Sequence, residues 1–161
     1  MTEEFSVRSN CEEETRQIAQ KISRLFLSGD IIMLDGELGV GKTYFVKGFT
    51  EGLHSQDLVS SPTFSIANFY RTDTTDLLHI DLYRILTVDD FNDLGLHDYF
   101  EQSIVLIEWG KKFADFFDAY LLISLEINDD NTRTLTFNNQ GDKYITTMAE
   151  LKKILKGDIV C

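Results

Sequence analysis

Residues 36–43 read Gly36-Glu37-Leu38-Gly39-Val40-Gly41-Lys42-Thr43, which fits the pattern G-x-x-x-x-G-K-[ST] of a phosphate-binding P-loop. The apolar run 31–35 before it is typical of a buried strand, and residues 44–49 after it carry apolar side chains at helical spacing. The motif requires this order of strand, glycine loop and helix. The alternative, a glycine-rich turn followed by a chance Lys-Thr, does not account for these flanks. The stretch therefore predicts an α/β fold that binds phosphate groups.

The chemistry of such a loop follows from its backbone. Glycines allow positive φ and a close approach to a phosphate chain. The exposed N–H groups form an anion nest at the N-terminus of the following helix. Within this nest we expect Lys42 to reach the β- and γ-phosphates, and the Thr43 hydroxyl to bind Mg²⁺.

Composition limits the classes of function. The chain has 161 residues, which suits a single domain spanning 1–161, and its formal net charge is −12. An acidic surface repels phosphate backbones, so a role with RNA would require a basic partner. Cys11 and Cys161 lack metal-ligand spacing and are interpreted as free thiols. Since no signal peptide and no membrane-length apolar stretch is present, we expect a cytoplasmic protein.

Hydrophobic periodicity predicts further helices and strands. Helices are expected at residues 11–28, from 87 onward with Thr87 as N-cap, and at 147–155. Strands are expected at residues 5–8, 65–70, 77–84, 104–107, 121–127 and 132–138. Polar residues at 72–76 and 129–131 predict two hairpins, and residues 139–142 are interpreted as a turn. A single α/β domain follows, with a mixed central sheet flanked by helices.

A P-loop also requires an acidic residue at the end of a neighbouring strand, which holds Mg²⁺ directly or through water. Glu108 follows the apolar run 104–107, which indicates a central strand; the alternative is an ordinary surface carboxylate. Asp81 shares a strand face with His79 and Tyr83 by period two. A polar face on an inner strand is costly unless it lines a site. We therefore interpret Asp81 as a water-orienting or magnesium-shell residue rather than an outward-facing one.

Three other positions admit two interpretations each. Thr63 lies where phosphate-switch proteins place a threonine that senses the γ-phosphate, but Ser61-Pro62-Thr63 also fits a proline-fixed turn before a strand. His79 alone is more typical of a structural histidine than of a base. Trp109 is more typical of packing than of base stacking.

Together these motifs resemble the TsaE (YjeE) family, small bacterial ATPases required for threonylcarbamoyladenosine modification of tRNA. The resemblance covers roughly residues 5–138. It rests on the order and spacing of the P-loop, Ser61-Pro62-Thr63-Phe64, His79-Ile80-Asp81-Leu82-Tyr83-Arg84, Leu94-Gly95, Asp98-Tyr99-Phe100 and Ile107-Glu108-Trp109. Val40 and Tyr44 depart from the smaller Ala and the Thr that many members carry.

The resemblance implies a P-loop NTPase that binds ATP or ADP with Mg²⁺ and hydrolyses slowly by itself. It implies action with the TsaD and TsaB proteins on tRNA adenosine 37, with tRNA contacted indirectly if at all. By position, the implied catalytic residues are Lys42, Asp81, Thr63 and Glu108, and the implied magnesium residues are Thr43, Glu108 and Asp81. The implied nucleotide-binding residues are Asn10 and Glu12 near the adenine, and Glu37, Leu38, Gly39, Val40, Gly41, Lys42 and Thr43 around the phosphates.

Two other functions remain open. A small-molecule P-loop kinase would pass the γ-phosphoryl group to an acceptor, although no Arg-rich lid segment follows the centre of the chain. A nucleotide-gated binding module would need ATP binding but not hydrolysis.

Overall fold

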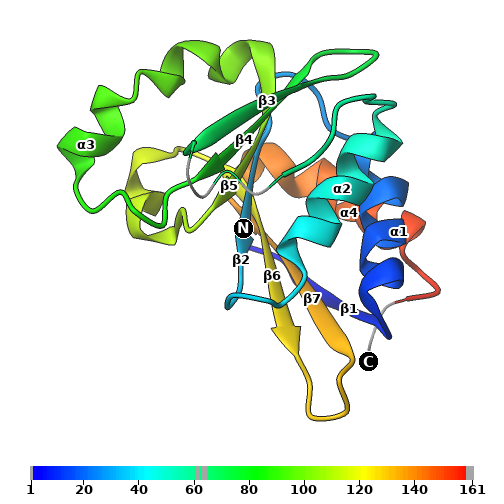
Figure 1. Ribbon diagram of the computed structural model, residues 1–161. Coiled ribbons are helices and arrows are strands. Elements are labelled where there is room, and N and C mark those ends of the chain that lie inside the picture. The colour runs from blue at the N-terminus through cyan, green and yellow to red at the C-terminus, as the bar shows by residue number, and fades with distance from the viewer. Residues whose placement is uncertain (1, 61, 63–64, 159–161) are drawn as a thin grey trace.

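The computed structural model describes residues 2–60, 62 and 65–158 (Figure 1). The chain forms a seven-stranded sheet with strand order β1-β7-β6-β2-β5-β4-β3. The strands are β1 (Glu4–Ser9), β2 (Ile31–Asp35), β3 (Ala67–Arg71), β4 (Asp76–Asp81), β5 (Ser103–Glu108), β6 (Tyr120–Ile127) and β7 (Arg133–Gln140). The α-helices are α1 (Glu12–Ser23), α2 (Lys42–Gly52), α3 (Val88–Asp93) and α4 (Ile145–Ile154). Short 3₁₀ helices are η1 (Leu96–Gln102), η2 (Lys111–Phe116) and η3 (Asp142–Tyr144).

The sheet is mixed. Strands β4, β5, β2 and β6 run parallel to one another, β3 is antiparallel to β4, and β7 is antiparallel to both β6 and β1. Both predicted hairpins are therefore confirmed. Because β2 lies between β5 and β6, the carboxyl ends of these parallel strands meet at the sheet edge where α2 begins.

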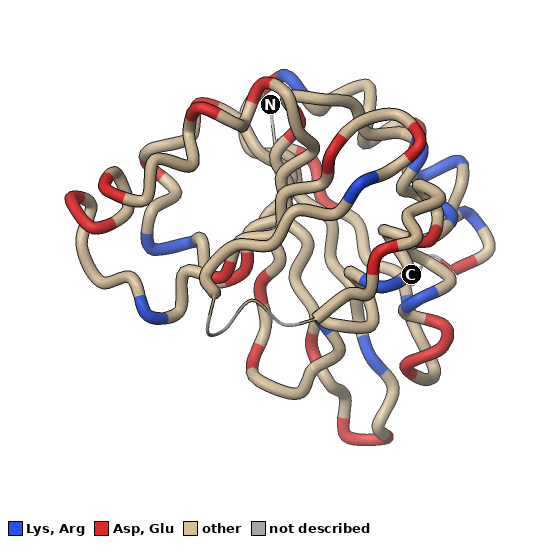
Figure 2. The backbone as a smooth tube through the Cα atoms, turned by 45° about the horizontal axis from the view of Figure 1, so that its top comes forward, with Lys and Arg blue, Asp and Glu red and all other residues tan. Residues whose placement is uncertain are grey.

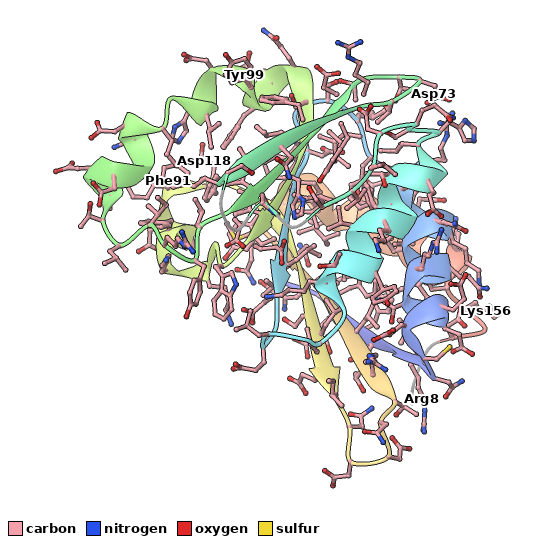
Figure 3. The ribbon with its side chains drawn as sticks, viewed as in Figure 1. Arg8, Asp73, Phe91, Tyr99, Asp118 and Lys156 are labelled. Carbon is pink, nitrogen blue, oxygen red and sulfur yellow. The ribbon has the colours of Figure 1, made fainter. Side chains whose placement is uncertain are left out.

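Two apolar clusters cover the two faces of the sheet. Helices α1 and α2 lie side by side on one face, with α4 next to them (Figure 1), and enclose a large cluster that includes Phe45 and Phe137. A second cluster surrounds Phe91 of α3, which Figure 3 labels. Alternate residues of β5 supply the two clusters: Ile104 belongs to the first and Val105 to the second. The central position predicted for this strand is confirmed.

Several predicted bounds differ from the observed ones by one or two residues, and three predictions are wrong for a reason that the structure shows. Helix α1 ends at Ser23 rather than at residue 28, because the chain turns there and buries the ring of Phe26 in the core. Strand β4 ends at Asp81, so Tyr83 lies beyond the strand and is 51% exposed. Residues 139 and 140 continue β7, and the expected turn begins only at Gly141, whose φ is +88°.

Acidic residues concentrate on the lobe formed by residues 85–102. This segment carries Asp89, Asp90, Asp93, Asp98 and Glu101, and no Lys or Arg. Figure 2 shows the acidic positions along this outlying part of the tube. In the described part of the chain, no helix has the length and apolar character that crossing a bilayer requires.

Candidate functional site

The glycine loop between β2 and α2 has the backbone geometry of an anion cradle. Gly36, Gly39 and Gly41 have φ values of +149°, +81° and +115°, which disfavour other residues. A Cβ atom at Gly36 would lie only 2.7 Å from the carbonyl oxygen of Leu125. The Phe45 N–H donates to the Gly41 carbonyl oxygen at 3.1 Å, at the start of α2. The N–H groups just before Phe45 precede the helical ladder and are available to an anion.

Lys42, the first residue of α2, directs its ammonium group inward. Only 6% of the residue is exposed. Its Nζ donates to the Gly36 carbonyl oxygen at 2.7 Å, lies 3.8 Å from Glu108 Oε1, and sits 4.4 Å from the centre of the Trp109 ring. A buried ammonium requires such partners. An ammonium in this position can also donate charge-assisted hydrogen bonds to phosphate oxygens.

The two acidic candidates are neighbours across the sheet. Asp81 and Glu108 end the parallel strands β4 and β5 and are paired in register. They are 7% and 6% exposed, respectively. Asp81 Oδ1 accepts a hydrogen bond from the Tyr83 N–H at 2.9 Å, and the Leu82 N–H donates to the Glu108 carbonyl oxygen at 3.0 Å. The two carboxylates therefore emerge together at the edge where α2 begins.

A cavity of about 210 Å³ joins these groups. Among the residues expected at the site, it is lined by Glu12, Leu38, Gly39, Gly41, Lys42, Thr43, Asp81 and Glu108; Tyr44 and Trp109 complete the lining. Glu37 and Val40 line a neighbouring cavity of about 580 Å³, to which Leu38 and Trp109 also contribute. The Val40 side chain packs in the main core, which explains why a residue larger than Ala fits there.

One expected site residue of the described chain, Asn10, lines neither of these two cavities. Asn10 lines a separate cavity of about 490 Å³, and its side-chain nitrogen donates to Glu14 Oε1 at 3.3 Å. Its proposed approach to an adenine therefore has no geometric support here. Thr63 lies outside the described residues.

Besides Tyr44, the structure adds three side chains that the sequence did not assign to the site. Trp109, expected to pack, stands beside Lys42 in the cavity wall. His79, expected to be structural, places Nε2 2.6 Å from Glu108 Oε2. Arg133 of β7 donates from Nε to the Val40 carbonyl oxygen at 3.3 Å and lies 3.6 Å from Glu12. Period two on β4 placed His79 with Asp81, whereas nothing in the local sequence links Arg133 to the loop.

Glu12, the first residue of helix α1, contributes to the cavity wall. A hydrogen bond with Glu12, together with the charge of that carboxylate, raises the pKa of the Tyr44 hydroxyl. Glu12 thus interacts with both Tyr44 of α2 and Arg133 of β7. Tyr44, which stands where many members of the family carry Thr, is therefore hydrogen-bonded to Glu12 in this chain.

The donor set fits a magnesium nucleotide better than a free metal ion. Across residues 2–60, 62 and 65–158, no three His, Cys, Asp or Glu side chains gather in a way that could hold a metal alone. Mg²⁺ is usually held by one or two carboxylates together with substrate phosphates and water. Asp81, Glu108 and the Thr43 hydroxyl beside an anion cradle match that requirement.

Comparisons with known proteins agree with this geometry. The model of the family described as "Threonylcarbamoyl adenosine biosynthesis protein TsaE" matches residues 9–135. The chain belongs to the TsaE family. The tRNA threonylcarbamoyladenosine biosynthesis protein TsaE of Bacillus subtilis (strain 168) is 38% identical over 143 residues, which cover 88% of this chain and 89% of that protein. TsaE of Treponema pallidum (strain Nichols) is 35% identical over 130 residues, covering 80% and 96%.

A solved structure supports the fold of this TsaE family member. The crystal structure of Bacillus subtilis YdiB superposes with a TM-score of 0.79 at 32% identity, covering 95% of this chain and 97% of that one. The chain is a single-domain α/β protein with the P-loop NTPase fold, as predicted.

Proposed function

We propose that this protein is a Mg²⁺-dependent, slowly hydrolysing ATPase subunit that supports threonylcarbamoyladenosine modification of tRNA adenosine 37. The observation that carries the proposal is the convergence of Lys42, Asp81 and Glu108 on one cavity at the N-terminus of α2. Membership of the TsaE family supports the biological context. The whole chain, residues 1–161, would act as one nucleotide-binding domain.

The described side chains suggest how the site would work. The loop N–H groups and Lys42 would bind the phosphate chain and neutralise charge on the β- and γ-oxygens. Thr43, Asp81 and Glu108 would hold Mg²⁺, which supplies charge neutralisation at the transferring phosphoryl group. One of the two carboxylates would orient the attacking water. From its position in the sequence, we propose that Thr63 senses the γ-phosphate.

The acidic surface supports action through protein partners rather than direct reading of tRNA. With a net charge of −12, the chain is unsuited to binding a phosphate backbone. We therefore propose that it works with the TsaD and TsaB proteins, and that ATP hydrolysis drives turnover or resetting of their assembly. A basic surface on a partner would complement the acidic lobe at residues 85–102.

A reconstituted modification assay tests the proposal. Purified TsaD, TsaB, tRNA, ATP and the activated carbamoyl donor are combined with the wild-type protein, the Lys42→Ala variant or no added protein. We expect only the wild type to sustain many turnovers and to release additional phosphate. Equal product in all three reactions would reject the proposal. A phosphorylated acceptor in place of free phosphate would favour the small-molecule kinase instead.

A further inference from the structure

His79 lies in the interior of the site without lining its cavity. It precedes Asp81 by two residues on β4, so both side chains lie on the same face of the sheet. The residue is 1% exposed, and its imidazole Nε2 lies 2.6 Å from Glu108 Oε2.

The two nitrogens of this imidazole have different surroundings. Carboxylate oxygens accept hydrogen bonds, so the 2.6 Å contact assigns the donor role to an Nε2–H of His79. Nδ1 is buried and has no hydrogen-bond partner among the described residues. Among the described residues, the Glu108 carboxylate is therefore the one hydrogen-bond partner of the His79 ring.

The two oxygens of the Glu108 carboxylate have different partners. Oε2 accepts from His79, while Oε1 lies 3.8 Å from Lys42 Nζ. A carboxylate without the first contact would be free to rotate about its terminal bond and to pair with the ammonium through either oxygen. His79 removes that freedom.

The ring is itself held from the other side. The Tyr70 ring centre lies 6.1 Å from that of His79, and Tyr70 is buried on β3. The Tyr70 hydroxyl donates to the Ser60 carbonyl oxygen at 3.0 Å, which fixes the tyrosine ring in turn. The imidazole on β4 thus lies between Glu108 of β5 and Tyr70 of β3.

We propose that His79 is a positioning residue, whose Nε2–H holds the Glu108 carboxylate so that Oε1 faces Lys42 and the phosphate cavity. The inference rests on the proposed function, because it assigns Glu108 a task in nucleotide hydrolysis. Side chains that orient a metal-linked or catalytic carboxylate typically contribute about 10–100-fold in activity when removed.

Steady-state phosphate release by the full chain with TsaD and TsaB, at saturating Mg²⁺, tests the role. His79→Leu removes the donor, His79→Gln restores an N–H of similar reach, and Ile80→Val is a matched buried change on the opposite face of β4. We expect His79→Leu to lower kcat about 10–100-fold with little change in KM for ATP. We expect His79→Gln to recover much of that loss and Ile80→Val to retain the wild-type rate.

A wild-type kcat in His79→Leu would overturn the proposal, as would a loss of kcat in Ile80→Val equal to that in His79→Leu. If wild-type protein itself released no phosphate, the proposed function would fail, and a second measurement would still decide the positioning role. Imidazole ¹⁵N NMR of the isolated protein, assigned by the signals missing in His79→Gln, identifies the protonated nitrogen. We expect a protonated Nε2 whose resonance shifts in Glu108→Ala. A protonated Nδ1 with bare Nε2, or an unchanged Nε2 resonance in Glu108→Ala, would overturn it.

Discussion

Gly48 of helix α2 packs directly against the backbone of Arg16 in helix α1. A Cβ atom at Gly48 would lie 2.0 Å from the Arg16 carbonyl oxygen, far inside van der Waals contact. One turn later, a Cβ atom at Gly52 would lie 2.7 Å from the Gln20 carbonyl oxygen. These two glycines therefore set the separation of α1 from the helix that begins at the phosphate loop.

Gly48→Ala is expected to destabilise the protein, even though Ala is favoured over Gly in a helix by about 1 kcal/mol. The clashing atoms are backbone, so the helices must separate, and overpacking of this kind costs about 1–3 kcal/mol or more. Urea unfolding measures the loss. Gly157→Ala is the control, because nothing lies within 4 Å of its Cβ position. Equal stability of the two variants would show that α1 and α2 are not held at this distance.

Lys42→Ala is expected to weaken nucleotide binding. Its ammonium is buried against Gly36 and Glu108 at the cavity, so its removal deletes the main cation available to a phosphate chain. The expected loss is about 1.5–3 kcal/mol for a charged hydrogen bond. Calorimetric titration with Mg-ADP measures it. Lys47→Ala on the same helix serves as control, because Lys47 is a lysine of α2 that does not line the cavity. An unchanged affinity in Lys42→Ala would contradict the assignment of the loop.

Asp81→Asn and Glu108→Gln are expected to slow ATP hydrolysis while nucleotide binding persists. Each change keeps the shape of the side chain and removes the negative charge beside the expected magnesium position. We expect each to slow phosphate release by about 10–100-fold, measured with the partner proteins present and alongside nucleotide affinity. If both variants bound ATP normally and still supported repeated modification, hydrolysis would not be required. The protein would then be a nucleotide-gated binding module.

Tyr144 couples stability to alkaline pH. Burial raises the pKa of its hydroxyl to about 12 from an ordinary value of 10.0, although the hydrogen bond accepted from the Ile31 N–H at 2.7 Å acts in the opposite direction. The folded protein thus holds this proton more tightly than the unfolded chain. Its contribution to stability is complete below about pH 10 and is lost as the pH rises through about 12.

Tyr144→Phe tests this coupling. The change leaves the Ile31 N–H without its acceptor, which costs about 1–3 kcal/mol at neutral pH. It also removes part of the decline in stability above about pH 10. This decline begins near the ordinary pKa of 10.0 and continues to the raised pKa of about 12 in the folded protein. Guanidinium unfolding at pH 7, 10 and 11 is the measurement, with the exposed Tyr99→Phe as control. A decline in Tyr144→Phe as steep as in the wild type would assign the alkaline sensitivity to other groups.

Charge reversal on the acidic lobe is expected to weaken association with a basic partner. Asp89→Lys combined with Asp90→Lys changes the most acidic turn of α3. Attraction between exposed charges is screened by salt, so the effect is expected to be large at low ionic strength and small at high. The measurement is the affinity of the double variant for the TsaD–TsaB pair. Asp129→Lys, at the β6–β7 hairpin, is the control variant for charge reversal elsewhere on the surface. Unchanged partner affinity at low salt would remove the electrostatic argument for this lobe.

Structural features that depend on a few neighbouring residues could be predicted from the amino-acid sequence. The P-loop pattern, the apolar strand that ends in Glu108, the Thr87 cap and both hairpins depend on local spacing. Thr87 Oγ1 accepts from the Asp90 N–H at 3.1 Å, as the N-cap pattern predicts. Helix α1 was predicted too long because the residues after Ser23 keep helical spacing, whereas burial of Phe26 decides where the chain turns.

The amino-acid sequence by itself determined that the chain is an α/β protein with a phosphate-binding loop, because glycine placement and hydrophobic period act over a few residues. Only the tertiary structure decided which side chains from distant parts of the sequence line the cavity or hydrogen-bond to the residues that line it. The register of β4 on β5 pairs Asp81 with Glu108 and brings His79 within hydrogen-bond distance of that carboxylate. The β6–β7 hairpin carries Arg133 to the loop 93 residues earlier in the chain. Such contacts depend on how strands align and how helices pack, and no local pattern specifies that alignment.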